Sequence, residues 1–225
     1  MRRILLVLAA AAAVVVAVAG AEPVLRQVTD VPTAVSWGVS DADALFCDSW
    51  RLSVETANAG PWRTVPARCG ASVRAYMEGE RYASDSAVAA AESLAFAAQA
   101  LASGEGGAMP AWVFDVDETL LSNAPYYAVS GWGLQEFNET SFDAWRNATE
   151  DNLLFAGYNS WEKLILRQIS DIGKTAVQYK SERRAAMEAE GFKILGNSGD
   201  QWSDLIGLPM ATRSFKLPNP MYFIS

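Results

Sequence analysis

Short apolar runs alternate with helix-forming segments along the second half of the chain. Trp112–Phe114 follows Pro110 and precedes helix formers, as a buried parallel strand would, and similar runs recur at 164–166 and 192–195. Between these last two, residues 173–191 have a helical composition that ends at glycine. Strand and helix therefore alternate from about residue 110 onward, which predicts an α/β fold with a parallel sheet flanked by helices.

The preceding part of the chain is predicted to be mainly helical. Ser84 or Asp85 can cap a helix through the alanine-rich stretch that follows, and glycines from position 104 onward should end it. With 225 residues, 51% of them hydrophobic, the chain can bury one sizeable core. We therefore expect a single domain over residues 22–225, with an N-terminal helical extension at 22–107 and a catalytic core at 108–225.

The first 21 residues form a separate module. Two arginines precede an unbroken apolar run from Ile4 to Ala19, and Ala19-Gly20-Ala21 fits an A-x-A cleavage site. A membrane anchor is the alternative, but the run is shorter than a typical span and ends in small residues. We expect a secretory signal that is cut after Ala21, and a mature chain that is lumenal or secreted and carries no membrane anchor.

A secreted chain of this composition has further expected properties. Loss of the two leading arginines changes the formal net charge from −8 to −10, which repels nucleic acid and anionic membranes and favours small molecules or proteins as partners. In an oxidising compartment, Cys47 and Cys69 are better explained by a disulfide than by a metal site. Asn138 and Asn147 each begin an N-glycosylation sequon.

Two acidic clusters follow predicted strands. Asp115 and Asp117 come at the end of the first strand, and Asp200 and Asp204 follow the last one. Each cluster alone has a plainer explanation, an acidic turn or a helix cap, and an EF-hand loop would need glycine where Leu120 stands. Together, at one edge of a parallel sheet and with a lysine-bearing helix between them, they predict a site for a hard, oxygen-preferring cation.

This arrangement resembles the haloacid dehalogenase (HAD) superfamily. Its motifs D-x-D-x-T and G-D-x-x-x-D are matched by Asp115, Asp117 and Thr119 and by Asp200 and Asp204. Longer stretches, among them CDSWRLSVET, DVDETLLSNAPYY, GKTAVQYKSERRAAM, GNSGDQWSDL and RSFKLPNPMY, are similar to plant acid phosphatases and vegetative storage proteins. The resemblance extends from about Cys47 to the C-terminus. It implies a HAD-like (Rossmann-like) fold and a location in the vacuole, in the cell wall or outside the cell.

The resemblance also implies hydrolysis of small-molecule phosphate monoesters through an aspartyl-phosphate. Asp115 would attack phosphorus, and Asp117 would protonate the leaving alcohol and later deprotonate water. Mg²⁺ would be held by Asp115, the Asp117 carbonyl and Asp200, with Asp204 bound to the metal or to one of its ligands. The chain contains no histidine, which excludes histidine phosphatases, dimetal phosphatases with histidine ligands and serine-histidine triads.

Other site residues follow from the family pattern. Its lysine corresponds to Lys180, with Lys174 as the rival, although a lysine on a helix is otherwise a solvated residue. Thr119 and Asn123 are expected to bind substrate. The Pro-Tyr-Tyr turn at 125–127 begins the segment that caps the site, where its tyrosines either stack on the leaving group or pack in the core. The chain could also form a homodimer.

One helix-strand unit of the family is missing. After the cap the family continues through a helix and an apolar strand that ends in Thr-Gly-Arg, whereas here Trp145 adjoins Arg146. Such a unit needs roughly 30 residues. Its threonine would donate a hydrogen bond to the phosphoryl group. Its strand would lie beside the strand that carries Asp115, and without it one side of that strand stays unpaired unless residues 163–167 pair with it. A weakly active or inactive storage-type relative, or a truncated isoform, is therefore the alternative function.

Overall fold

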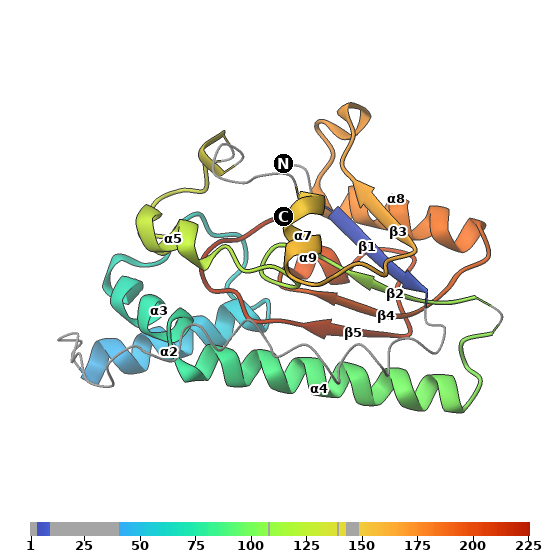
Figure 1. Cartoon of the computed structure of the whole chain (residues 1–225). Helices are drawn as coiled ribbons and strands as arrows, with labels where there is room; N and C mark the ends of the chain where they lie inside the picture. Colours follow the sequence, from blue (N-terminus) through green and yellow to red (C-terminus); the bar gives the residue numbers. More distant parts are fainter. Residues whose placement is uncertain (1–3, 10–40, 108, 139, 143–148) are drawn as a thin grey trace.

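The structure is a computed structural model, and it describes residues 4–9, 41–107, 109–138, 140–142 and 149–225. Its strands form one sheet in the order β3-β1-β2-β4-β5 (Figure 1). In chain order they are β1 (Ile4–Ala9), β2 (Pro110–Phe114), β3 (Lys163–Leu166), β4 (Lys193–Gly199) and β5 (Arg213–Lys216). The α-helices of the described segments are α2 (Asp41–Glu55), α3 (Gly70–Met77), α4 (Glu80–Ala102), α5 (Ala124–Ser130), α7 (Thr149–Phe155), α8 (Ala176–Ala189) and α9 (Trp202–Leu205). Two short 3-10 turns are η2 (Ala67–Cys69) and η3 (Ile169–Asp171).

The α/β prediction is confirmed in the part of the sheet that carries the acidic clusters. β2, β4 and β5 are parallel neighbours, so the carboxyl ends of β2 and β4 lie side by side. β4 continues to Gly199, beyond the predicted run at 192–195, and Asp200 therefore follows the strand directly. β5 is a strand that the apolar pattern did not predict.

β1 occupies the place where the sequence indicated a missing strand. It pairs antiparallel with both β2 and β3, with Leu8 opposite Trp112 on one side and Leu5 opposite Ile165 on the other. From the sequence, this side of β2 was expected either to be exposed or to pair with residues 163–167. Neither expectation is correct, because β1 lies between β2 and β3 and pairs with both. The run expected to be a signal thus supplies a central strand of the sheet, while its expected cleavage site, Ala19–Ala21, lies outside the described residues.

Helices cover the two faces of the sheet. Successive side chains of a strand point to opposite faces, so Trp112 and Val113 mark one face each. The Trp112 ring packs on Phe96 of α4, with 6.2 Å between ring centroids, and Val113 packs in a cluster with Met187 of α8. The Trp112 ring also needs Gly196 beside it, because a Cβ there would lie 2.4 Å from the ring. α4 and α8 therefore sandwich the sheet.

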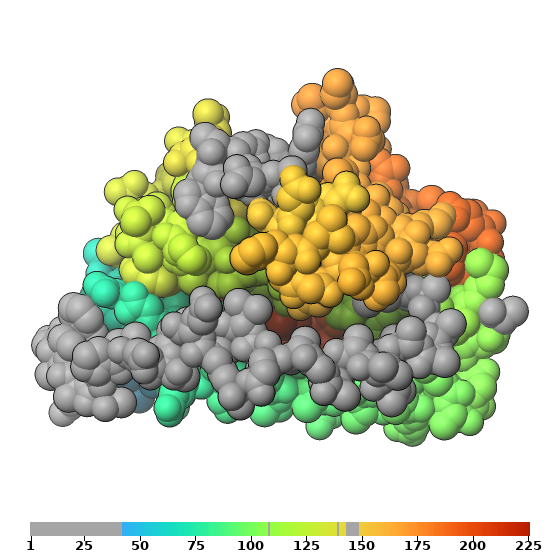
Figure 2. Space-filling model, viewed as in Figure 1, coloured from blue at the N-terminus to red at the C-terminus, as the bar shows by residue number. Residues whose placement is uncertain are grey.

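α7, coloured gold in Figure 2, lies on the face of the molecule that this view shows. Leu153 of this helix is fully buried against Val116, and the two pack with partly buried apolar side chains of β2 and β3. This cluster fixes the turn that begins at Asp115.

α4 begins about one and a half turns earlier than predicted. Its N-cap is Gly79, whose extended backbone allows the helix to start at Glu80, and Ser84 and Asp85 lie within the first two turns. Asp85 does not cap the helix; its Oδ2 accepts a hydrogen bond from the Tyr76 hydroxyl at 2.8 Å. The prediction of a cap at 84–85 was wrong because a serine or aspartate is equally suited to a tertiary contact.

The N-terminal helices pack against α5 and the C-terminal segment. The disulfide Cys47–Cys69 joins α2 to the turn that precedes α3. Tyr126 and Tyr127 are buried in the same cluster, and Tyr127 stacks on Tyr222 with 5.3 Å between ring centroids. Of the two alternatives for these tyrosines, core packing is the one observed. Within the described segments, none of the helices combines the length and the apolar character needed to cross a membrane.

Candidate active site

The acidic clusters meet at the carboxyl ends of β2 and β4. Asp115 follows β2, and its N–H donates to the Ser198 carbonyl at 2.9 Å, which extends the ladder past the strand. Asp200 follows β4, and Asp204 lies in the first turn of α9. One carboxylate oxygen from each of these three buried aspartates lies within 4.8 Å of the others.

Gly199 allows this close approach. A Cβ at this position would lie 2.4 Å from the carboxylate of Asp204, so a larger residue would push α9 away from β4. The same helix is held from the other side by Arg184 of α8, whose Nη1 donates to the Asp204 carbonyl at 2.9 Å. The position of Asp204 is thus fixed by contacts with both neighbouring elements.

Lys180 of α8 reaches into the cluster. Its Nζ lies 2.5 Å from Oδ1 of Asp115 and also donates to Oδ1 of Asp204, and the residue is 1% exposed. The rival, Lys174, binds Asp171 at 3.0 Å and Glu182 and does not line the pocket. Of the two candidates, the geometry places Lys180 in the site.

The cluster carries more negative than positive charge. Burial raises the pKa of Asp115 to about 6; Lys180 opposes this shift, and the charges of Asp200 and Asp117 add to it. Burial, followed by the charge of Asp204, likewise raises the pKa of Asp200 to about 6. Asp204 is shifted upward too, because burial and the charge of Asp115 raise its pKa against the pull of Lys180. A cation at this place would stabilise all three carboxylates in the ionised form.

Asp200 presents one oxygen to the cluster without a hydrogen bond. Its Oδ2 accepts from the amides of Asn219 at 2.6 Å and Gln201 at 2.9 Å. Its Oδ1 is buried and has no hydrogen-bond partner among the described residues. Buried polar atoms are nearly always paired, so a carboxylate oxygen of this kind fits a divalent cation held by oxygen ligands. The donor set of the site therefore suits a divalent metal.

Asp117 lies in the same pocket and is held by the turn that follows β2. Asn123 donates from Nδ2 to Oδ1 of Asp117 at 3.1 Å, and its N–H donates to Glu118 at 2.7 Å. Glu118, buried and in the left-handed region with φ of 55°, also accepts from the hydroxyl of Tyr222. Burial and the charges of Asp200 and Asp117 raise the pKa of Glu118 well above its usual range. Asn123 and Thr119 do not themselves line the pocket.

The pocket has an acidic floor and an apolar wall. The floor is Asp115, Asp117, Lys180, Asp200 and Asp204, and the rest of the lining is Phe137, Phe142, Gln201, Tyr222 and Ile224. The sequence motifs did not indicate this second group, nor Glu118 and Asn219. Gln201 and Glu118 lie next to motif residues, but the aromatic residues carry no local signal and reach the site only through tertiary packing.

Some predicted features lie at the surface or outside the described residues. Asn138 is exposed, and its Oδ1 accepts from the Ser141 N–H at 2.8 Å. Asn147 and the Trp145–Arg146 junction fall outside the described segments.

The motifs, the three parallel strands β2, β4 and β5, and the carboxylate cluster are those of the HAD superfamily. The family model for HAD superfamily subfamily IIIB, acid phosphatase, matches residues 34–149 and 144–225, and the chain belongs to this family. It is 44% identical over 218 residues to acid phosphatase 1 of Solanum lycopersicum, covering 81% of this chain and 85% of the relative. It is also 36% identical to a stem 28 kDa glycoprotein of Glycine max (79% of this chain, 84% of the relative) and 33% identical to vegetative storage protein 2 of Arabidopsis thaliana (79% and 80%). The family and its hydrolase class, expected from the motifs, are confirmed.

The alignment also bears on the missing unit. The alignment has 218 positions, but 81% of the 225-residue chain is only about 182 residues. About 36 positions therefore hold a residue of the tomato relative and none of this chain. The two segments matched by the family model meet at residues 144–149, which contain the Trp145–Arg146 junction. A helix-strand unit of roughly 30 residues accounts for a gap of this size.

Proposed function

We propose that the chain hydrolyses small phosphate monoesters through an aspartyl-phosphate on Asp115, with Mg²⁺ as the cofactor. The observation that carries this proposal is the buried cluster of Asp115, Asp200 and Asp204, whose oxygens lie within 4.8 Å of one another with the Lys180 ammonium bound to two of them. A purely structural role would not need three buried carboxylates around a single cation, because the uncompensated charge destabilises the fold.

Two displacements at phosphorus complete the reaction. In the first, a carboxylate oxygen of Asp115 forms a bond to phosphorus while the ester P–O bond breaks, and the Asp117 carboxyl gives its proton to the leaving alkoxide. In the second, a water oxygen bonds to phosphorus as the acyl-phosphate P–O bond breaks, and Asp117 takes the proton of that water. The products are the alcohol and inorganic phosphate, and Asp115 is regenerated.

The other residues stabilise charge and hold these groups in place. Lys180 neutralises the phosphoryl oxygens as they approach Asp115, and Asn123 fixes the Asp117 carboxyl by the hydrogen bond to its Oδ1. Asp115, Asp200 and Asp204 would hold the Mg²⁺, which supplies positive charge against the phosphate and keeps the carboxylates ionised. The apolar wall of Phe137, Phe142 and Tyr222 faces the leaving group.

A storage role is the second candidate function. It is favoured by the missing helix-strand unit, whose threonine would contact the phosphoryl group, and by the similarity to vegetative storage proteins. A secreted or vacuolar location would suit either function, and Asn138, exposed on the cap segment, would be open to glycosylation there.

The two functions differ in a direct assay. Hydrolysis of an aryl phosphate at acidic pH should require Mg²⁺, should stop on addition of EDTA and should be lost in Asp115→Asn. Folding of each protein is checked by circular dichroism. A well-folded chain whose phosphate release equals that of Asp115→Asn would exclude the phosphatase function and leave the storage function.

A further inference from the structure

We infer that Glu55, the last residue of α2, is a positioning residue for the carboxylate cluster. It acts through Asn219 on Asp200 and through Trp202 on the helix that carries Asp204. The inference rests on the proposed function and adds to it a role for the N-terminal helices, which contribute no residue to the pocket lining in the described part of the chain.

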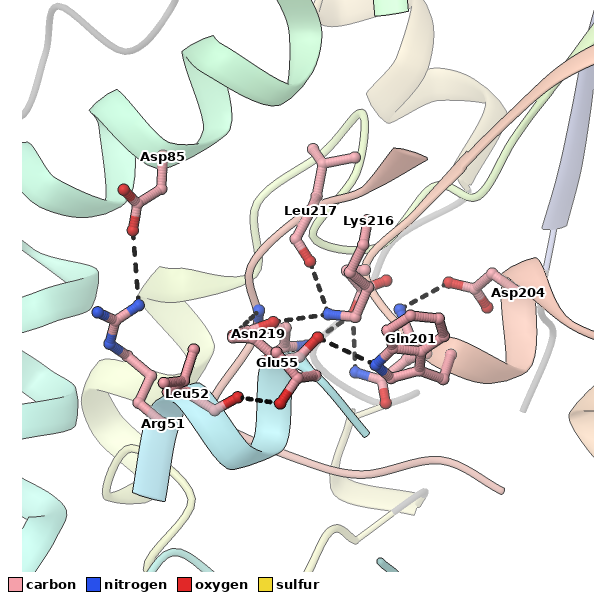
Figure 3. Close-up of polar contacts among 12 residues, drawn as sticks. Arg51, Leu52, Glu55, Asp85, Gln201, Asp204, Lys216, Leu217 and Asn219 are labelled. Carbon is pink, nitrogen blue, oxygen red and sulfur yellow. Dashed lines mark hydrogen bonds and ion pairs between the residues drawn. The ribbon is translucent and has the colours of Figure 1, made fainter. Parts of the chain in front are cut away.

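Both carboxylate oxygens of Glu55 accept hydrogen bonds from the C-terminal segment (Figure 3). Its Oε1 accepts from the Asn219 N–H at 2.9 Å, and its Oε2 accepts from Nζ of Lys216, the last residue of β5, at 2.7 Å. The side chains of Glu55 and Lys216 are each 15% exposed, so the ion pair is largely shielded from water. Local helix stability does not explain an acidic residue here, because a negative charge at the carboxyl end of a helix is unfavourable.

Asn219 passes this restraint to Asp200. Its backbone N–H is held by Glu55, its Oδ1 accepts from the Met221 N–H at 2.9 Å, and its Nδ2 donates to Oδ2 of Asp200 at 2.6 Å. Asn219 is 1% exposed, so water cannot replace these bonds readily. With Oδ2 of Asp200 fixed, its unpartnered Oδ1 is the oxygen left for the cation.

A second contact from the same residue reaches α9. The Glu55 carbonyl accepts from Nε1 of Trp202 at 3.1 Å. Trp202 begins α9, and Asp204 lies two residues further along this short helix. The end of α2 therefore contacts the supports of two of the three clustered carboxylates. Polar groups that hold metal ligands in this way typically change metal affinity or activity about 10- to 100-fold when removed.

The plainer explanation is an ion pair that only fastens α2 to the core. α2 has such a pair one turn earlier: Nη1 of Arg51 lies 3.5 Å from Oδ2 of Asp85 on α4, and Figure 3 shows it directed away from Asp204 and Gln201. Asp85 also accepts from Tyr76, so Asp85→Asn weakens the attachment of the N-terminal helices without touching Asn219 or Asp200. It serves as the matched control.

The test measures Mg²⁺ binding by isothermal titration calorimetry, alongside kcat, KM and thermal stability. The proteins are the parent chain, Glu55→Ala, Glu55→Gln, Asn219→Ala, the double variant Glu55→Ala with Asn219→Ala, and Asp85→Asn. We expect Asn219→Ala to weaken Mg²⁺ binding about 10- to 100-fold. Glu55→Ala should weaken it by a smaller factor, and Glu55→Gln, which keeps an acceptor for Asn219, less still. KM should change less than kcat.

The double variant separates positioning from general stability. Glu55→Ala removes the side-chain acceptor of the Asn219 N–H and leaves the backbone carbonyl that accepts from Trp202. If Glu55 acts through Asn219, the double variant should bind Mg²⁺ about as weakly as Asn219→Ala alone, so the two effects should be less than additive. Asp85→Asn should lower the melting temperature and leave Mg²⁺ affinity unchanged. Unchanged affinity in Glu55→Ala, additive losses, or an equal loss in Asp85→Asn would each overturn the inference while the parent chain stays active. A parent chain that binds no Mg²⁺ and releases no phosphate would contradict the proposed function and the inference with it.

Discussion

The ammonium nitrogen of Lys180 lies 2.5 Å from the Asp115 carboxylate, although 65 residues separate them along the chain. α8 supplies the lysine and β2 the aspartate, and the two elements meet because α8 packs on the face of the sheet marked by Val113. The pair places a fixed positive charge beside the proposed nucleophile.

Replacement of Lys180 should reduce catalysis far more than replacement of the neighbouring lysine. In Lys180→Met, the charge beside Asp115 is lost, and we expect kcat to fall about 10²- to 10³-fold, as for other single groups that stabilise charge in a transition state. Lys174→Gln should keep kcat near that of the parent chain, since Lys174 binds Asp171 and Glu182 outside the pocket. Steady-state kinetics on both variants test this, and equal losses would show that the position of Lys180 is not what matters.

The sheet should depend on its N-terminal strand. A chain that starts at Glu22 lacks β1, so β2 and β3 each present an unpaired edge in the middle of the sheet. We expect the 22–225 protein to melt at a lower temperature than the 1–225 protein and to self-associate, because unpaired strand edges recruit other chains. Thermal denaturation and light scattering compare the two. Identical melting curves and monomeric behaviour would mean that β1 is not part of the native sheet.

Restoring the missing unit should increase the rate. When the helix-strand segment of the tomato relative is inserted between Trp145 and Arg146 of the 22–225 chain, β2 should gain a second parallel neighbour besides β4, and the phosphoryl group should gain a hydrogen-bond donor. The expected gain in kcat is about 10²- to 10³-fold, the usual effect of one such donor. Phosphate release is measured for the chain with and without the insert. Equal rates would show that the missing threonine has no part in the reaction.

The strands and the acidic clusters could be predicted from sequence for a physical reason. Trp112 and Val113 of β2 and Ile194 and Leu195 of β4 are buried on both faces of the sheet, so both strands contain a short apolar run, and Asp115 and Asp200 directly follow the two strands. The parallel order of β2 and β4 then brings these two aspartates to one edge. The local sequence is therefore sufficient to predict where a residue lies when only the burial and the direction of its strand decide its position.

Contacts between distant segments could not be predicted in this way. β1 pairs with strands more than 100 residues away, and its apolar composition is the same as that of a signal sequence. β5 is short and only partly apolar, so its pattern resembles a loop. Glu55 and Asn219 lie 164 residues apart, and the stretches that contain them resemble the family without indicating that the two residues meet.

Asp171 should contribute stability that is lost only in strong acid. Its pKa is lowered from 3.8 to about 2, mainly by the Gln168 N–H, which donates to its carboxylate at 2.9 Å, and then by Lys174 and Arg183. A carboxyl whose pKa is depressed on folding stabilises the protein above its unfolded pKa, and this stabilisation disappears as pH falls through the folded pKa.

The parent chain should therefore melt at a higher temperature than Asp171→Asn above about pH 4, and the difference should shrink as pH falls toward 2. Melting curves between pH 2 and pH 7 measure this difference. A constant difference over the whole range would indicate that the hydrogen bonds of Asp171, and not its charge, are responsible.

The proposed nucleophile can be identified by trapping the covalent intermediate. In Asp117→Asn the second step lacks its base, whereas an aryl phosphate, with a good leaving group, still reacts in the first step. The protein is mixed with an aryl phosphate and Mg²⁺, quenched in acid, and reduced with borohydride, which converts an aspartyl-phosphate to homoserine. Peptide mass spectrometry should find homoserine at position 115 and nowhere else, and none in the variant that also carries Asp115→Asn. Release of phosphate by the parent chain without homoserine at position 115 in the trapped sample would contradict the account.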